Sequence, residues 1–169
     1  SYLGDYFGSQ GVSDSAFLHY FKAEKIYLKQ NDNFNLGKTR LNKAQLQYNE
    51  SDFLGSEISA LKALRFLKGE ETYELFNLLG IVYNELGEYD KAIEFHNKAI
   101  AILEKSPTPV EFQSKATTMN NLGLVYLNLG QFQKAIPYFE KGLEQKNDLI
   151  LYKPFVYGML LNNLGYSRF

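Results

Sequence analysis

The sequence predicts an all-α protein in which antiparallel helix pairs stack on one another. Apolar residues recur at the spacing of one helix face over residues 76–83 and again over residues 89–103. Gly87 separates the two stretches and can adopt the left-handed backbone that ends a helix. One small residue in each stretch, Gly80 and Ala92, leaves room for the two backbones to approach closely. The unit is therefore predicted to be a helical hairpin.

The unit from Thr72 to Lys105 resembles the tetratricopeptide repeat. The signature of that family runs from an aromatic residue through Leu-Gly and a tyrosine to an alanine, an aromatic residue and a second alanine. The matching residues are Phe76, Leu79, Gly80, Tyr83, Gly87, Tyr89, Ala92 and Ala99, with His96 in the second aromatic position. The resemblance implies a right-handed α-α superhelix, a solenoid of stacked helix pairs with a concave inner surface.

The same pattern divides the whole chain, which we interpret as a single array over residues 1–169. Its approximate repeats are residues 1–30 (partial), 34–69, 72–105, 112–147 and 154–169 (partial). A small residue of the first helix recurs roughly every 40 residues, against a family period of about 34. These anchors are Gly4, Ala44, Gly80, Gly123 and Gly165. The helices or their connections are therefore expected to be longer than in the minimal repeat.

The first half of the chain departs most from the pattern. Residues 1–7 are predicted to be a frayed remnant of a first helix that ends in a turn at Gly11. In the next repeat Ala44 replaces the packing glycine and Ser51 replaces the turn glycine. Three helices are predicted in this half, over residues 14–30, 34–48 and 53–68.

The second half follows the pattern closely. Prolines within residues 106–109 cannot continue a helix and indicate a linker. Pro137 lies in the first turns of its helix, where a lost backbone donor costs least, so we expect a slight bend and no break. Because the array opens and closes within a repeat, each end would expose an apolar face. We therefore expect a fragment of a longer protein, with exposed repeat ends that allow self-association. The helices predicted in this half cover residues 112–130, 131–147 and 154–169.

Composition argues against several functional classes. The net charge of -1 and the pI near 6.1 argue against a surface that contacts nucleic acid. The sequence has no cysteine and no apolar run of about 18 residues, so neither thiol chemistry nor membrane contact is expected. His19 and His96 have no partner at metal-ligand spacing, and we find no set of nucleophile, base and orienting residue. No metal, cofactor or enzyme activity is therefore predicted, while cytoplasmic and periplasmic locations both stay open.

The family resemblance also implies a groove, since the first helices of such arrays line the concave face and hold a peptide or a partner helix. Asn77, Asn120 and Asn162 recur at one position in three successive units and would stack as a ladder that pairs with a peptide backbone. Alternatively, these asparagines and the neighbouring Asn121 and Asn163 hydrogen-bond to the adjacent repeat. The candidate groove residues are Asn77, Asn120, Asn162, Asn84, Asn128, Ile81, Leu124, Tyr166 and Lys38.

The sequence therefore predicts a non-catalytic domain that binds a protein or peptide segment in its groove. The resemblance to extended-period repeats implies a sensing or scaffolding module of a larger bacterial regulator. Two alternatives stay open. One is a structural spacer that mediates self-association or domain docking. The other is the repeat domain of a peptide-regulated phosphatase or kinase, whose catalytic residues would lie in another segment.

Overall fold

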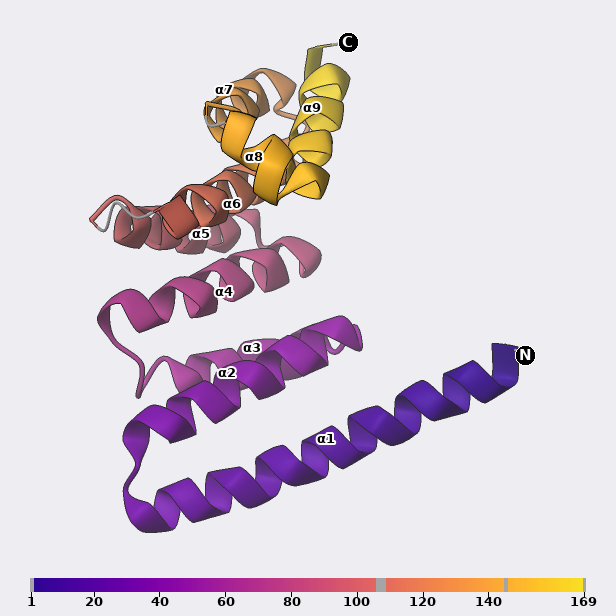
Figure 1. The fold of residues 1–169 in the computed structure, drawn as a ribbon, viewed down its shortest axis with the longest axis vertical. Helices are drawn as coiled ribbons and strands as arrows, with labels where there is room; N and C mark the ends of the chain where they lie inside the picture. Colours follow the sequence, from indigo (N-terminus) through magenta and orange to yellow (C-terminus); the bar gives the residue numbers. More distant parts are fainter. Residues whose placement is uncertain (1, 106–108, 145, 169) are drawn as a thin grey trace. The chain divides into compact units, whose positions relative to one another are not determined.

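The computed structural model of the protein describes residues 2–105, 109–144 and 146–168, and every regular element in them is helical (Figure 1). Antiparallel neighbours pack in pairs, so the predicted all-α fold of stacked helix pairs is confirmed. The chain divides into two compact units, Ser1–Lys68 and Gly69–Phe169. Among the described helices, none combines the length and the apolar character needed to cross a membrane.

The first unit contains three helices, in which α2 packs on both α1 and α3. Their bounds are α1 Tyr2–Gln30, α2 Asn33–Asn49 and α3 Phe53–Ala63. The Asp32 carboxylate accepts a hydrogen bond from the Asn35 backbone N–H at 3.1 Å. The Asp52 carboxylate accepts one from the Gly55 N–H at 2.9 Å. These two caps satisfy backbone donors that a helix start leaves without partners, and so fix where α2 and α3 begin.

Two boundaries predicted for this unit are wrong. α1 is one continuous helix with no turn at Gly11. A remnant of about two turns is too short to be a stable separate helix, whereas continuing the helix keeps its backbone hydrogen-bonded. α3 ends at Ala63 and does not reach Lys68. Residues 64–66 form a turn instead, and this turn directs Leu67 into the core, where it is 2% exposed.

The helix-ending turns use one backbone conformation whether or not a glycine is present. The φ angle is 62° at Ser51, compared with 75° at Gly87 and 70° at Gly130. Asn31, between α1 and α2, has a φ of 53°. A residue with a Cβ atom pays a steric cost in this region because Cβ crowds a neighbouring carbonyl oxygen. The interpretation of Ser51 as a substitute for the turn glycine is confirmed by this angle.

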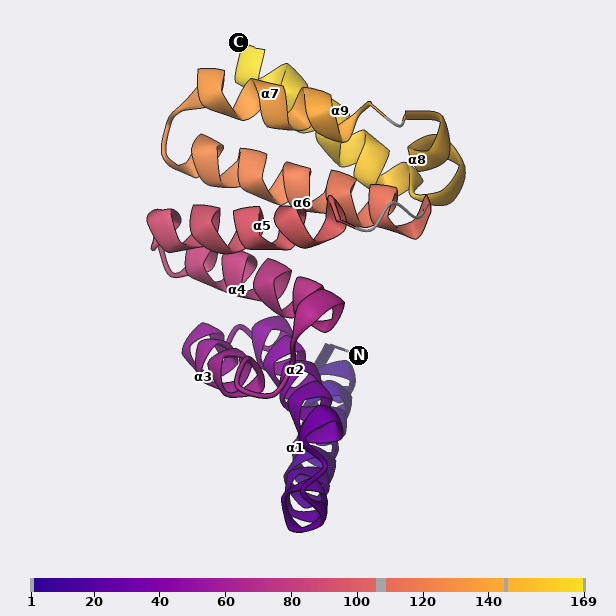
Figure 2. The same ribbon diagram turned by 90° about the vertical axis from the view of Figure 1, so that its left-hand side faces the viewer.

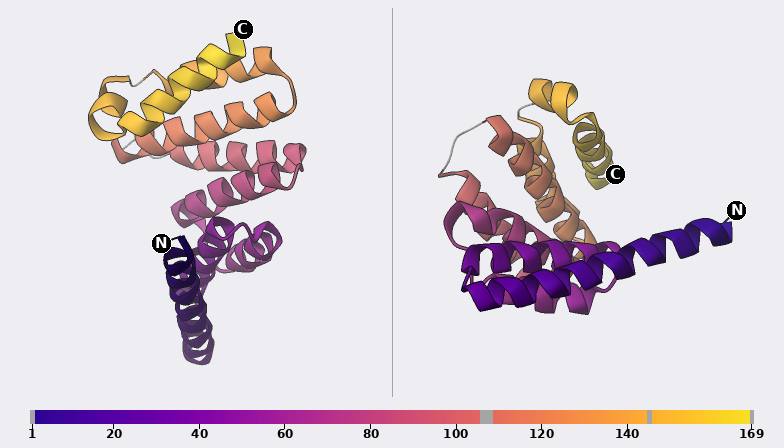
Figure 3. Two further views of the ribbon diagram at one scale, coloured as in Figure 1. Left: turned by 90° about the vertical axis from the view of Figure 1, so that its right-hand side faces the viewer. Right: turned by 60° about the horizontal axis from the view of Figure 1, so that its bottom comes forward.

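The second unit starts with a short 3-10 helix and continues as a layered stack. Its elements are η1 Gly69–Thr72, α4 Tyr73–Glu85, α5 Tyr89–Leu103, α6 Pro109–Asn128, α7 Phe132–Gly142, α8 Lys146–Tyr152 and α9 Pro154–Arg168. Figure 2 shows α4, α5, α6 and α7 lying one above another, and α9 packs on α7 (Figure 3). Pro109 and Pro154 are the first residues of their helices, where the N–H that proline lacks would have no partner in any case.

The end of α7 differs from the prediction. The helix stops at Gly142 and does not continue to Asn147, and α8 is a separate short helix that the sequence analysis did not predict. Leu149 of α8 is buried in a core cluster with Leu160 of α9, so the chain must leave α7 early to place it there. Pro137 does not break α7, as expected.

Each complete helix pair of this unit is centred on a glycine of its first helix. A Cβ atom added to Gly80 would lie 2.6 Å from the His96 ring, and one added to Gly123 would clash with the Phe139 ring. Both rings are completely buried. The space that the glycine leaves at these two positions is filled by an aromatic ring from the second helix. By contrast, nothing lies within 4 Å of a Cβ added to Gly165 on α9.

Candidate functional site

Asparagine amides connect the first helices of the second unit. α6 contacts both α4 and α9. Asn121 on α6 donates from Nδ2 to Asn77 Oδ1 on α4, with 3.4 Å between the two atoms. Asn128 donates from Nδ2 to Asn84 Oδ1 at 3.0 Å. Because an amide carries both donors and acceptors, these bonds leave each side chain with further hydrogen-bonding capacity.

Asn77 and Asn120 each bond to an asparagine of the next repeat, and among the described residues no hydrogen bond joins Asn77, Asn120 and Asn162 to one another. Asn163 on α9 donates from Nδ2 to Asn120 Oδ1 at 2.9 Å, just as Asn121 donates to Asn77. In both bonds the donor lies two residues before its packing glycine and the acceptor three residues before that of the preceding repeat. The alternative pairing with the adjacent repeat therefore describes Asn121 and Asn163 as donors and Asn77 and Asn120 as acceptors.

The three asparagines Asn77, Asn120 and Asn162 differ in their exposure to solvent. Asn120 is 1% exposed, and its Nδ2 has no hydrogen-bond partner among the described residues. Asn77 is half-buried, and Asn162 is exposed. A peptide on the surface could therefore reach Asn77 and Asn162, whereas Asn120 acts from below the surface by holding Asn163.

Asn84 and Asn128 make a direct rung between equivalent parts of successive repeats. Asn84 is half-buried and Asn128 is exposed, and both lie in the last turn of their helices. After their mutual bond, the amide Nδ2 of Asn84 can still donate a hydrogen bond and Oδ1 of Asn128 can still accept one. The rung therefore offers one donor and one acceptor to a peptide group.

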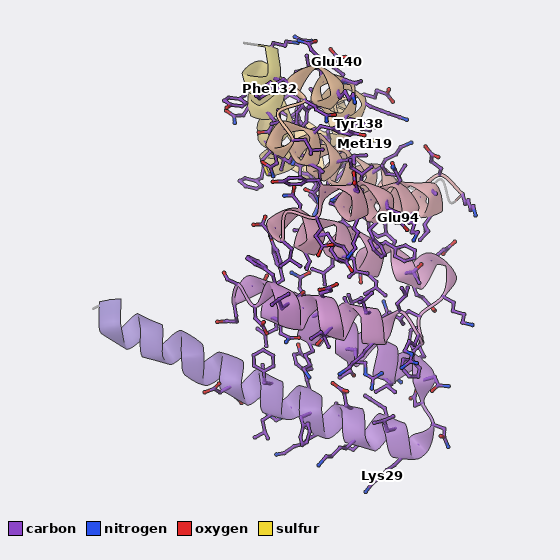
Figure 4. The ribbon with its side chains drawn as sticks, turned by 180° about the vertical axis from the view of Figure 1, so that it is seen from behind. Lys29, Glu94, Met119, Phe132, Tyr138 and Glu140 are labelled. Atoms are coloured by element: carbon purple, nitrogen blue, oxygen red, sulfur yellow. The ribbon has the colours of Figure 1, made fainter. Side chains whose placement is uncertain are left out.

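Apolar side chains follow the packing glycines on the same three helices. Ile81 and Leu124 are half-buried, and Tyr166 is 66% exposed. The Tyr166 ring meets the edge of Phe132, with 6.1 Å between ring centroids, and Figure 4 shows Phe132 beside α9. Lys38, the remaining candidate, is half-buried on α2 in the first unit.

A pocket that the sequence analysis missed lies beside these aromatic residues. Its volume is about 660 Å³, and it is lined by residues 130–134 of the turn before and the start of α7 and by residues 166–168 of α9. A smaller pocket of about 350 Å³ lies at the corresponding turn one repeat earlier, along residues 87–91. The sequence signal common to both is an aromatic residue two positions after the turn glycine, Tyr89 and Phe132.

His96, the histidine of the second unit, is a packing residue. His96 is 0% exposed, and neither ring nitrogen has a hydrogen-bond partner in the described part of the chain. Burial lowers the pKa of His96 from its ordinary value of 6.5 to about 4, so the ring is neutral at pH 7. Among the described residues, no three His, Asp or Glu side chains gather as metal ligands would. The predicted role of His96 in the core is confirmed.

Burial also raises the pKa of the Tyr73 phenol, although hydrogen bonds moderate the shift. The Tyr73 hydroxyl lies 3.1 Å from the Ser114 backbone oxygen and 3.1 Å from Thr118 Oγ1. These contacts tie the start of α4 to α6. The phenol therefore has a structural role in holding α4 to α6.

The geometry of stacked helix pairs with small residues at their contacts defines a helical-repeat protein. Residues 71–148 match the model of the tetratricopeptide repeat family. Such repeats are in general non-catalytic modules that bind proteins or peptides or act as scaffolds.

Among the solved structures that match, one aligns over nearly the whole chain. The crystal structure of BtubC (BKLC) from P. vanneervenii superposes with a TM-score of 0.68 at 23% sequence identity. The alignment covers 92% of this chain and 63% of that protein. At this level of identity the likeness concerns the fold. No curated protein sequence matches the chain significantly.

Proposed function

We propose that the second unit binds an extended peptide segment of a partner protein along α4, α6 and α9, without catalysing a reaction on it. The observation that carries the proposal is the Asn84–Asn128 rung, an amide pair with spare donor and acceptor groups on neighbouring first helices. The exposed Asn162 and the half-buried Asn77 extend this polar surface. An extended peptide is the matching ligand because its backbone alternates donors and acceptors.

Typical hydrogen-bond energies indicate how the binding energy would be divided between polar and apolar contacts. A neutral hydrogen bond contributes about 0.5–1.5 kcal/mol net. Micromolar affinity requires about 8 kcal/mol, so a few amide bonds cannot supply it alone. Ile81, Leu124 and Tyr166 would contribute the remainder by burying apolar surface. The ligand is therefore expected to carry apolar side chains between polar backbone contacts.

The charge of the surface restricts the ligand further. The candidate residues on α4, α6 and α9 are neutral amides and apolar side chains, and Lys38 lies in the other unit. An acidic C-terminal tail would find no cation among them. We therefore expect internal peptide segments of low charge to bind better than peptides with a free acidic terminus.

The test uses peptides selected from a random peptide library on the purified chain. Their affinity is then measured by calorimetry against the double variant Asn84→Ala, Asn128→Ala. Loss of about two hydrogen bonds should weaken binding at least about fivefold. The matched control is Asn97→Ala, which removes an exposed amide from the second helix α5 and should leave affinity unchanged.

A second measurement distinguishes backbone recognition from side-chain recognition. Methylation of single peptide amides in the selected ligand should reduce affinity at alternate positions, because each methyl group removes a donor. Equal affinity for the double variant and the parent chain, with an unchanged helical spectrum, would contradict the proposal.

We further propose that the chain is a sensing or scaffolding module of a larger bacterial regulator. This assignment is supported by the family's general role in protein interaction. Reading the gene on both sides of this segment would test it. A kinase or DNA-binding domain in the same reading frame would agree with the assignment, and a frame that encodes only these residues would contradict it.

A further inference from the structure

The outer face of α3 is apolar, although this helix also has a buried face on its other side. The buried residues of α3 are small, and the helix packs on α2. The Ser56 hydroxyl, for example, donates to the Ala44 backbone oxygen of α2 at 2.8 Å. With about 3.6 residues per turn, Leu54, Ile58 and Leu61 lie together on the side opposite the buried residues. These three residues form the α3 stripe, and they are 64%, 54% and 39% exposed.

The second helices of the other pairs have no such stripe. Counted from the anchoring small residue of each first helix, its positions correspond to Asp90, Glu94 and Asn97 on α5 and to Gln133, Pro137 and Glu140 on α7. All six residues are exposed. On α5 they stay exposed although α6 of the next repeat packs against that helix. The stripe therefore belongs to the outward side of a helix pair. Large apolar side chains gathered at such a position are typical of an interaction surface.

The charged residues at the two ends of the stripe indicate what covers it. Asp52 caps the start of α3, and Lys62 and Arg65 lie at its end and in the turn that follows. All three are exposed, so the surface runs from an acidic start through an apolar centre to a basic end. A second copy in the antiparallel direction is complementary to this surface, because opposite charges then lie side by side. A parallel copy would bring like charges together.

We propose that two copies of the chain associate through the α3 stripe, with the two α3 helices antiparallel about a two-fold axis near Ile58. Arg65 of each copy then lies beside the acidic start of the other α3. The contact uses the same surface on both copies, so it closes at the dimer. This inference is independent of the proposed peptide surface, which lies in the second unit.

The size of the surface sets the strength of the association. Stable protein interfaces bury about 1,200–2,000 Å² in total. α3 has 11 residues, and three large apolar side chains of each copy are covered. The dimer should therefore be weak and should form only as the protein concentration rises.

The first test measures mass by sedimentation over a dilution series from micromolar to millimolar concentration. The parent chain should rise from its monomer mass of 19.4 kDa toward twice that value and no further. Ile58→Glu introduces the residue type that α5 has at the corresponding position. It should raise the dissociation constant at least about tenfold, because two carboxylates would meet in an apolar contact. Its fold should be preserved, since Ile58 is exposed and glutamate favours a helix.

The matched control is Ile26→Glu on α1. It makes the same change at a position of nearly equal exposure, 51%, outside the α3 stripe. This variant should associate like the parent chain. Circular dichroism confirms that both variants are folded.

Disulfide cross-linking tests the direction of the two helices. The chain has no cysteine, so a single introduced cysteine can form only the disulfide between two copies. Ile58→Cys should cross-link on mild oxidation because Ile58 lies near the two-fold axis. Leu54→Cys should not, because antiparallel helices place the two copies of residue 54 at opposite ends of the contact. Cross-linking of Leu54→Cys would indicate parallel helices and would contradict the proposal.

Four other results would also overturn it. They are a parent chain that stays monomeric, undiminished association of Ile58→Glu, loss of association in Ile26→Glu, and masses beyond the dimer. A monomeric chain that binds a library peptide, and loses it on Ile58→Glu, would assign the α3 stripe to a different protein partner.

Discussion

The α4–α5 and α6–α7 pairs place different aromatic rings in the same position. In both, the ring is completely buried against a glycine of the first helix. Phe139 is apolar throughout, whereas His96 buries two ring nitrogens that have no partner in the described residues. The repeat therefore restricts the shape of this residue more strictly than its polarity. Burial of the two His96 nitrogens lowers the stability of the fold and makes this stability depend on pH.

The largest loss of stability is expected from removing the Phe139 ring, which contains no polar atoms. Phe139→Ala should lower the free energy of unfolding by about 3–5 kcal/mol, because it leaves a cavity between α6 and α7. His96→Ala should cost less, since the loss of packing is partly offset by removal of the unpaired nitrogens. Urea denaturation of both variants, followed by circular dichroism, checks the order. Equal losses would show that the two positions are energetically equivalent.

The second largest effect is expected in acid, which should destabilise the α4–α5 pair more than the α6–α7 pair. The pKa of His96 is about 4 in the folded chain and near 6.5 when exposed, so the unfolded chain binds more protons between these values. Protonation therefore imposes no penalty on folding above about pH 6.5, and stability is progressively lost as pH falls from 6.5 toward 4. At pH 5 the loss should be about 2 kcal/mol relative to His96→Phe. Denaturation of both proteins at pH 7.5 and pH 5 measures the difference, and parallel behaviour would contradict it.

Making the two pairs alike should have a smaller effect at neutral pH. His96→Phe reproduces the ring of α7 in α5 and removes two buried groups without hydrogen bonds. We expect stabilisation of about 1 kcal/mol at pH 7.5, which is the lower part of the cost of a buried unsatisfied polar group. The reciprocal change, Phe139→His, should destabilise the chain. A less stable His96→Phe protein would indicate that the ring nitrogens have a favourable role.

The smallest change in stability is expected from substitutions in the turns that follow α2 and α4. Ser51→Gly should stabilise the first unit by up to about 1 kcal/mol, because glycine adopts a positive φ without a Cβ clash. Gly87→Ala should have the opposite sign at the matching turn of the second unit. Thermal unfolding of the two variants checks both signs, and a destabilised Ser51→Gly would show that serine makes a compensating contact.

The sequence predicted best where two repeats could be compared. The spacing of Gly80, Gly87 and Ala92 placed the α4–α5 hairpin, because small residues and turn glycines have few other uses in a helix. The extent of α1 was not predictable from the same pattern, since a glycine marks a turn only if the following chain has a surface to pack on. The short α3 and the separate α8 likewise depend on where Leu67 and Leu149 find the core.

The candidate surface was predictable only in part. Recurrence of Asn77, Asn120 and Asn162 pointed to α4, α6 and α9, the helices whose asparagine amides connect successive repeats. The diagonal bonds of Asn121 and Asn163 depend on the offset between stacked helices, which a linear pattern does not contain. The pocket beside Tyr166 depends in turn on how α9 lies across α7, and no single repeat encodes that arrangement.

Tyr126 and Tyr138 stack with 5.2 Å between their ring centroids and 12° between their planes. Desolvation, followed by the hydrogen bond with Tyr126, raises the pKa of Tyr138 to about 12, and Figure 4 shows Tyr138 on α7. The chain has 13 tyrosines and no tryptophan, so its ultraviolet absorption comes mainly from phenols. In alkaline titration, Tyr138 should ionise after phenols of ordinary pKa. The change in ultraviolet absorption when Tyr138 ionises therefore reports whether α7 is packed on α6, and it requires no attached label.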